Sequence, residues 1–112
     1  MNEVADFTVA NAGTNSNGHC SLGLQLVGLV LPSLTSTTIG FQFSLDGSTW
    51  STIYDRESTP AAVTLGGADT GSKTVAVPAE VARISACGWV RLVVAEQAAE
   101  RAIKGLYARV ES

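Results

Sequence analysis

The chain has 112 residues, a length that suits one domain built around a single hydrophobic core. Hydrophobic residues make up 46% of it and charged residues 15%, against roughly 25% charged residues in an ordinary soluble domain. The formal net charge is −3 and the seven Lys and Arg residues are scattered, so the chain lacks the basic patch of a nucleic-acid-binding protein.

The first 20 residues predict an arm or loop ahead of the folded domain. The start, residues 1–6, has neither the basic nor the apolar region of a signal peptide, so we expect folding in a cytoplasm. Residues 3–10 alternate weakly, as in a strand or an extended arm, and residues 11–18 are all turn-forming types. We therefore divide the chain into an N-terminal arm or loop, residues 1–20, and a β-sandwich domain, residues 21–112.

Residues 7–45 contain no Asp, Glu, Lys or Arg. One interpretation is a polar loop that leads into two core strands. The other is that this segment lies against another protein, because the buried part of an interface is depleted in charged residues. The sequence leaves both interpretations open.

One strand and one hairpin follow. Residues 22–31 form an apolar run whose alternation changes phase near Val27 and Gly28, which predicts a bulge or a strand buried on both faces. The run is too short to cross a bilayer, so we expect no membrane partner. Residues 39–45 alternate with period two, Asp46-Gly47 supplies a turn, and residues 49–54 return as the partner strand.

The C-terminal half predicts short strands at residues 62–65, 73–77 and 89–94, with a turn cluster at residues 66–71 and a helical turn at residues 78–84. Residues 95–110 also carry a helical stripe of four alanines with Ile103, Leu106 and Val110. The β-compatible run at its end and the need to close a sheet favour a strand, which we predict for Arg101–Val110.

These elements predict an all-β fold, an antiparallel two-sheet sandwich that is jelly-roll-like and holds at most one short helical turn. We expect the following residues in its core: Leu24, Leu26, Leu29, Leu31, Phe41, Phe43, Leu45, Ile53, Val75, Ile84, Leu92 and Leu106.

Nucleophiles and metal ligands are sparse. His19 is the one histidine, and with Cys20 and Cys87 it gives at most three ligands where a structural zinc site needs four. A catalytic histidine also needs a nucleophile and an orienting group beside it. We therefore expect a surface His19, no catalytic, metal or cofactor site, and no enzyme activity. Both cysteines are expected to be reduced and buried, with a disulfide as the alternative.

Other candidate residues have a simple structural explanation. Asp46, Asp55 and Glu57 lack the spacing of a calcium site or of a glycosidase pair, so we interpret them as solvated loop carboxylates. Gly66-Gly67 lacks the GK[ST] ending of a phosphate loop. Core packing is the simpler role for Trp50 and Trp89, and a ligand platform or interface anchor is the alternative.

Residues 22–32, 39–55, 75–78, 88–92 and 101 onward resemble a group of small tailed-phage and prophage structural proteins. The pattern FxxSxDGxxW, over Phe41–Trp50, also resembles the hairpin of discoidin-like, galactose-binding jelly rolls. The resemblance excludes the first 20 residues.

The phage resemblance implies a capsid decoration or cement subunit on the surface of a virion, made in the host cytoplasm. Its partners would be the major capsid protein or other virion subunits, and it would form a homo-oligomer, with a trimer favoured. The arm at residues 1–17 would then order on docking. The alternatives are a carbohydrate-binding β-sandwich module, implied by the discoidin-like hairpin, and a tail or neck structural subunit.

Overall fold

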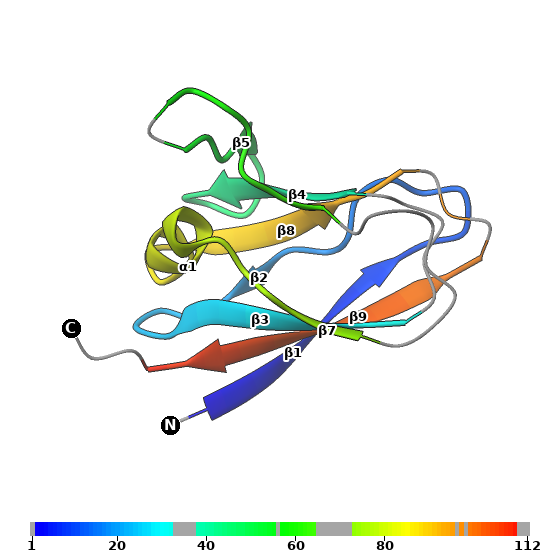
Figure 1. Ribbon diagram of the computed structural model, residues 1–112, viewed down its shortest axis with the longest axis horizontal. Coiled ribbons are helices and arrows are strands. Elements are labelled where there is room, and N and C mark those ends of the chain that lie inside the picture. Colours follow the sequence, from blue (N-terminus) through cyan, green and yellow to red (C-terminus); the bar gives the residue numbers. More distant parts are fainter. Residues whose placement is uncertain are drawn as a thin grey trace.

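The computed structural model describes residues 2–32, 38–55, 57–64, 73–95, 97 and 99–109. Two antiparallel sheets lie in two layers, and one short helix lies at one end of them (Figure 1). The elements are β1 (Asn2–Val9), β2 (His19–Cys20), β3 (Gln25–Leu31), β4 (Thr38–Ser44), β5 (Ser51–Thr52), β6 (Ala62–Thr64), β7 (Lys73–Ala76), α1 (Ala79–Ser85), β8 (Trp89–Val93) and β9 (Arg101–Ala108). The predicted all-β sandwich is confirmed, and its helix has seven residues, about two turns instead of one.

The strand order is that of a jelly roll. Sheet A has the order β1-β9-β3-β7, and sheet B has β2-β8-β4 with β5 and β6 both on the far edge of β4. Strands pair from the ends of the chain inward: β1 with β9, β2 with β8, β3 with β7, and β4 with β5 and β6. The chain is therefore one long antiparallel ribbon, and folding it over adds the pairs β3·β9 and β4·β8.

The core lies between the sheets and contains most of the predicted residues. Those found buried are Leu24, Leu26, Leu29, Leu31, Phe41, Ile53 and Leu92, and those packed against them while partly buried are Phe43, Val75 and Ile84. Two predictions were wrong. Leu45 is 83% exposed because β4 ends at Ser44, and Leu106 pairs with the exposed Val4 on the outer side of sheet A.

The N-terminal arm predicted over residues 1–20 is corrected by β1. Residues 2–9 pair with the whole of β9 without a break, and Ala5, Phe7 and Val9 are buried in the core. The following loop crosses from sheet A to sheet B, where the side-chain hydroxyl of Ser16 accepts a hydrogen bond from the Leu92 N–H at 2.8 Å. The N-terminal segment is thus part of the sandwich, and deleting it would remove one edge of the core.

Other local predictions are confirmed with small changes of bounds. The register between β3 and β9 shifts between Leu26 and Gly28, which is the predicted irregularity near Val27. The last strand forms, as Arg101–Ala108. The hairpin forms as well, but Phe43 pairs with Ser51, so a longer loop replaces a tight two-residue turn. The predicted turn at residues 66–71 and the end of the last predicted strand at Val110 lie outside the described residues.

Within the described part of the chain, no helix has the length and apolar character needed to span a membrane.

Candidate binding surface

His19 joins the two sheets where their edge strands meet. Its Nε2 lies 2.8 Å from Oε1 of Glu3, so β2 of sheet B is tied to β1 of sheet A. The hydrogen bonds from His19 and Ser21 hold the pKa of Glu3 below its usual range. The imidazole also lies against the rings of Tyr107 and Phe7, with centroids 5.2 and 6.2 Å away. The predicted surface histidine is therefore half-buried and acts as a cross-sheet contact.

Tyr107 is the most enclosed polar group beside this pair. Its hydroxyl is buried and has no hydrogen-bond partner among the described residues, and burial raises the pKa of the phenol above its usual range. The phenol therefore stays protonated at neutral pH. Cys20 and Cys87 are both free thiols, but Cys87 is exposed, which corrects the expectation that both are buried.

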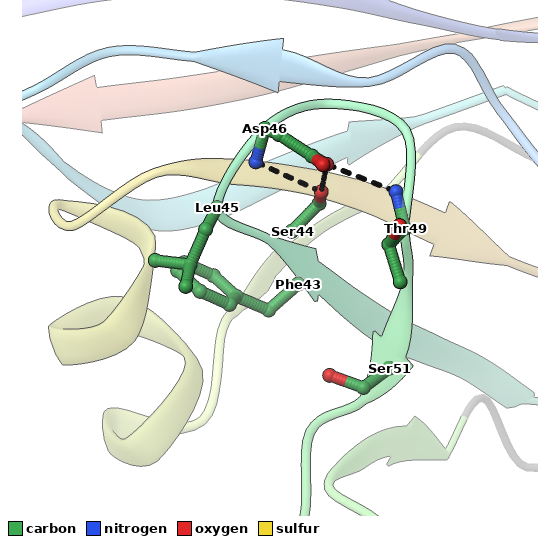
Figure 2. Close-up of a pocket in the computed structure, with 6 residues that line it drawn as sticks. All are labelled: Phe43, Ser44, Leu45, Asp46, Thr49 and Ser51. Atoms are coloured by element: carbon green, nitrogen blue, oxygen red, sulfur yellow. Dashed lines mark hydrogen bonds between the residues drawn. The ribbon is translucent and has the colours of Figure 1, made fainter.

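Asp46 organises the loop between β4 and β5. Its Oδ1 accepts hydrogen bonds from the Thr49 N–H at 3.0 Å and from the Ser44 hydroxyl at 2.9 Å (Figure 2). It also accepts one from the Ser48 N–H at 2.8 Å. These bonds lower the pKa of Asp46 to about 2. A pocket of about 300 Å³ lies beside the loop, between Phe43 and Leu45 on one side and the Asp46 turn on the other. The Asp46 carboxylate is used within its own loop.

Replacing Asp46 with asparagine should remove a pH-dependent part of the stability. A depressed carboxyl pKa stabilises the fold above the unfolded value near 3.8, and this contribution is lost as the pH falls through about 2. We expect Asp46→Asn to be less stable than the parent at neutral pH, with the difference closing between those two pH values. Urea unfolding across that range measures this. Thr49→Ala keeps the backbone donor and should show no such closing; a constant gap for Asp46→Asn would contradict the assignment.

Asp55 also organises its own loop. Oδ1 of Asp55 accepts hydrogen bonds from the N–H groups of Glu57 and Thr59 at 2.8 and 3.0 Å. Among the described residues, no three His, Cys, Asp or Glu side chains are arranged to hold a metal ion. Gly66-Gly67 lies outside the described residues.

The outer side of sheet B carries an aromatic surface. We name Gln42, Trp50, Trp89 and Arg91 the tryptophan platform. The Arg91 guanidinium lies 4.5 Å from the ring centroid of Trp50, and its Nε donates to Oε1 of Gln42 at 2.7 Å. Trp89 is 36% exposed and Trp50 is half-buried. The predicted core packing is therefore wrong for Trp89, because Val90, Leu92 and Val94 occupy the inward positions of this segment.

Two glycines make room for the rings. A Cβ at Gly18 would lie 2.6 Å from the six-membered ring of Trp50, and a Cβ at Gly47 would lie 3.1 Å from the Trp89 indole. Gly18 belongs to the loop before β2, and Gly47, with a φ of 81°, belongs to the Asp46 loop. The two loops therefore bring the platform together from distant parts of the chain.

A groove of about 290 Å³ continues the platform along sheet B and shares Gln42 with it. Gly40 lies at its middle, opposite Val93 on β8 and Ala62 on β6. Thr38, Gln42 and Thr52 add polar groups, and Pro60 adds an apolar wall. We name this the Gly40 groove.

The outer side of sheet A carries an apolar row that crosses its four strands. Across its four strands, Val4 pairs with Leu106, Leu106 with Gly28, and Gly28 with Ala76. The next row holds one ion pair, Asp6 with Lys104, followed by Val30 and Thr74. Val4 is 62% exposed, so an apolar row faces solvent in the isolated chain.

Sequence reasoning named both tryptophans but missed Arg91, Gln42 and the Gly40 groove. The signal was partly present, since Gly40 and Gln42 alternate with the inward Ile39 and Phe41. Neither the pairing of Gln42 with Arg91 nor the approach of Gly18 can be read without the strand order.

Comparison with protein-family models, curated proteins and solved structures gives no significant match to this chain.

Proposed function

We propose that this protein is a non-catalytic structural subunit of a tailed-phage virion, a capsid decoration or cement protein that acts by protein–protein contact. Its partners are copies of itself, with a trimer favoured, and the major capsid protein or another virion subunit. Its place is the capsid surface, after synthesis in the host cytoplasm. The observation that carries the proposal is the apolar row, including the exposed Val4, on the outer side of sheet A.

Three features support this role. Burying an apolar row such as Val4, Leu106 and Ala76 in an interface lowers the free energy by about 25 cal/mol per Å² of apolar surface. The jelly-roll order occurs in viral capsid proteins, as well as in lectins. The segment without charged residues supplies β3, in the middle of sheet A. Many such contacts around a shell stabilise it together, because each bound subunit favours the assembled state.

The test places lysines on the apolar row at exposed positions. Val4→Lys and Ala76→Lys should leave the fold intact, because exposed substitutions change stability by about 0.5 kcal/mol or less. Each should weaken self-association and capsid binding by roughly tenfold or more, since an unpaired charge would be buried on docking. Light scattering and co-sedimentation with capsids of the phage or prophage that encodes the protein measure the two effects.

Thr59→Lys, in an exposed loop away from sheet A, is the matched control and should bind as the parent does. A parent chain that stays monomeric and leaves the capsids in the supernatant would rule out the proposal. So would capsid binding that is the same for all three lysine variants.

A further inference from the structure

We infer that two copies of this chain associate through the outer edge of β1, which pairs antiparallel with β1 of the second copy about a two-fold axis at Val4. The two copies of sheet A then form one continuous sheet. The inference does not rest on the proposed function, because it concerns an edge of sheet A and not capsid docking through its outer side. A two-fold contact is compatible with a three-fold contact elsewhere on the subunit, and the two together would give a hexamer.

The strand β1 lies at an edge of its sheet. It pairs with β9 on one side, and among the described residues no strand pairs with its other side (Figure 1). The N–H and C=O groups on the outer side of an edge strand can pair with a strand of another chain. At the opposite edge of sheet A, β7 has four residues where β1 has eight. The edge of β1 is therefore the longer of the two.

Asn17 covers one half of this edge with its side chain. Its Oδ1 accepts a hydrogen bond from the Thr8 N–H at 2.7 Å, and its Nδ2 donates to the Asp6 carbonyl at 3.1 Å. These are backbone groups that an added strand would use. Alternate residues of a strand point their backbone groups to the same side, so the N–H and C=O of Val4 point outward as those of Asp6 and Thr8 do. The open part of the edge therefore runs from Asn2 to the Asp6 N–H.

A second β1 centred on Val4 uses only this open part. The Val4 N–H of each copy donates to the Val4 carbonyl of the other, and the Asp6 N–H of each copy donates to the Asn2 carbonyl of the other. Each of these hydrogen bonds occurs twice because of the two-fold symmetry. In this register Asp6 lies opposite Asn2 and Glu3 lies opposite Ala5, so no carboxylate faces another.

The neighbouring registers are less favourable. Pairing centred on Glu3 or on Asp6 would place two identical carboxylates directly opposite each other, which destabilises a strand pair. Pairing centred on Ala5 would place Asn2 opposite Thr8, whose N–H already donates to Asn17. The side chain of Asn17 and the two acidic residues therefore select the register centred on Val4.

The side chains of β1 also suit a second copy of the same strand. Val4 is 62% exposed and pairs with Leu106, so facing Val4 of the second copy would continue the apolar row from one subunit into the other. The two carboxylates already have partners within the subunit, Glu3 with His19 and Asp6 with Lys104. Neither carboxylate needs a counter-ion from the second copy.

Cross-linking tests the register. Cys87 has an exposed thiol, so the test uses a Cys87→Ser background. Hydrogen-bonded residues in antiparallel strands have Cα atoms about 5.5 Å apart, within the range of about 4.4–6.8 Å that a disulfide spans. Val4→Cys should therefore give a covalent dimer on mild oxidation, seen by non-reducing electrophoresis. Thr8→Cys, on the same face of β1, is the matched control and should not, because its two copies would lie about 26 Å apart along the strands.

Removing one backbone donor tests the hydrogen bonds. Proline is tolerated in an edge strand where the N–H faces away from the sheet, as it does at Val4. Val4→Pro should lower the affinity of self-association by roughly tenfold or more, since each of the two copies loses a donor. Val4→Ala keeps the N–H and should have a smaller effect. Sedimentation equilibrium measures both affinities.

Amide exchange in the parent chain gives a measurement that does not depend on how Val4→Pro folds. Exchange of the Val4 and Asp6 amides should slow as the protein concentration rises, because the second copy covers them. The Thr8 amide, which donates to Asn17, should exchange at the same rate at every concentration.

Three outcomes would overturn the inference. They are a parent chain that stays monomeric or trimeric at millimolar concentration, equal cross-linking of Val4→Cys and Thr8→Cys, and exchange at Val4 that is independent of concentration. Capsid binding by a chain with any of these results would leave the proposed function standing. A dimer that does not bind capsids would leave the β1 contact standing, so the two proposals fail separately.

Discussion

Replacing Phe7 with alanine is expected to lower the free energy of unfolding by about 3–5 kcal/mol. Phe7 has no exposed surface and lies on β1, the edge strand of sheet A, so its ring holds that strand against the core. The loss is large beside the roughly 5–15 kcal/mol that stabilises a typical domain. Urea unfolding followed by tryptophan fluorescence measures it, because Trp89 lies on the other sheet and Trp50 lies in the loop just before β5 of that sheet.

The ring of Phe7 packs directly against Gly105 of β9, so a second variant can test the same contact. A Cβ at Gly105 would lie 2.4 Å from Cε2 of Phe7. The ring therefore occupies the space that a side chain at position 105 of β9 would need. Gly105→Ala alone should therefore destabilise the protein. In the Phe7→Leu background the same change should cost less, since the clashing edge of the ring is gone.

Val4→Ala is the matched control for Phe7. It changes a residue of the same strand that faces solvent, and it should alter stability by about 0.5 kcal/mol or less. If Phe7→Ala and Val4→Ala had similar small effects, β1 would not be part of the cooperative fold. The N-terminal segment would then be the docking arm that its turn-rich composition suggested.

The sequence predicted elements whose patterns are local. Ile39 and Phe41 alternate with Gly40 and Gln42, and this period of two defined the strand before its partners were known. The same alternation rule also applies to residues 89–94, where it was not used. Val90, Leu92 and Val94 face inward, so Trp89 and Arg91 had to face outward, and the exposure of Trp89 could have been deduced.

The errors arose where pairing is distant or where a strand ends early. β1 pairs with the opposite end of the chain, and its alternation rests on Ala5 and Phe7 with polar residues between them, so no nearby pattern marked it as a core strand. Leu45 continued the alternation of β4, but the Ser44 hydroxyl accepts hydrogen bonds from the N–H groups of Asp46 and Gly47 and turns the chain there. Side-chain capping overrode periodicity at that point.

The binding surface was beyond sequence reasoning for a further reason. Trp50, Gly18 and Arg91 come from three separate segments, and only the jelly-roll order places them side by side. The sequence shows which residue types are present, whereas the contacts among these three residues depend on the strand order. The fold class could therefore be predicted from the sequence, while the Gly40 groove could be found only in the three-dimensional structure.

The second large effect concerns Ser85, which joins α1 to the bulge in β3. Its hydroxyl accepts a hydrogen bond from the Leu26 N–H at 2.8 Å and donates to the Ala82 carbonyl at 2.6 Å. Leu26 lies where the register with β9 shifts, and both it and Ser85 are fully buried. Ser85→Ala should cost about 1–3 kcal/mol, because a buried N–H loses its acceptor.

Hydrogen exchange measures the size of that loss of stability and also shows where in the structure it falls. The Leu26 amide should exchange much faster in Ser85→Ala than in the parent, while amides in the middle of β8 should change only with the overall stability. Ser51→Ala, at an exposed position in β5, is the control and should leave the Leu26 amide protected. An equally slow Leu26 amide in Ser85→Ala would mean that another group accepts this hydrogen bond. The helix would then be held to the sandwich by apolar packing, chiefly through Val81, and the bulge would not depend on it.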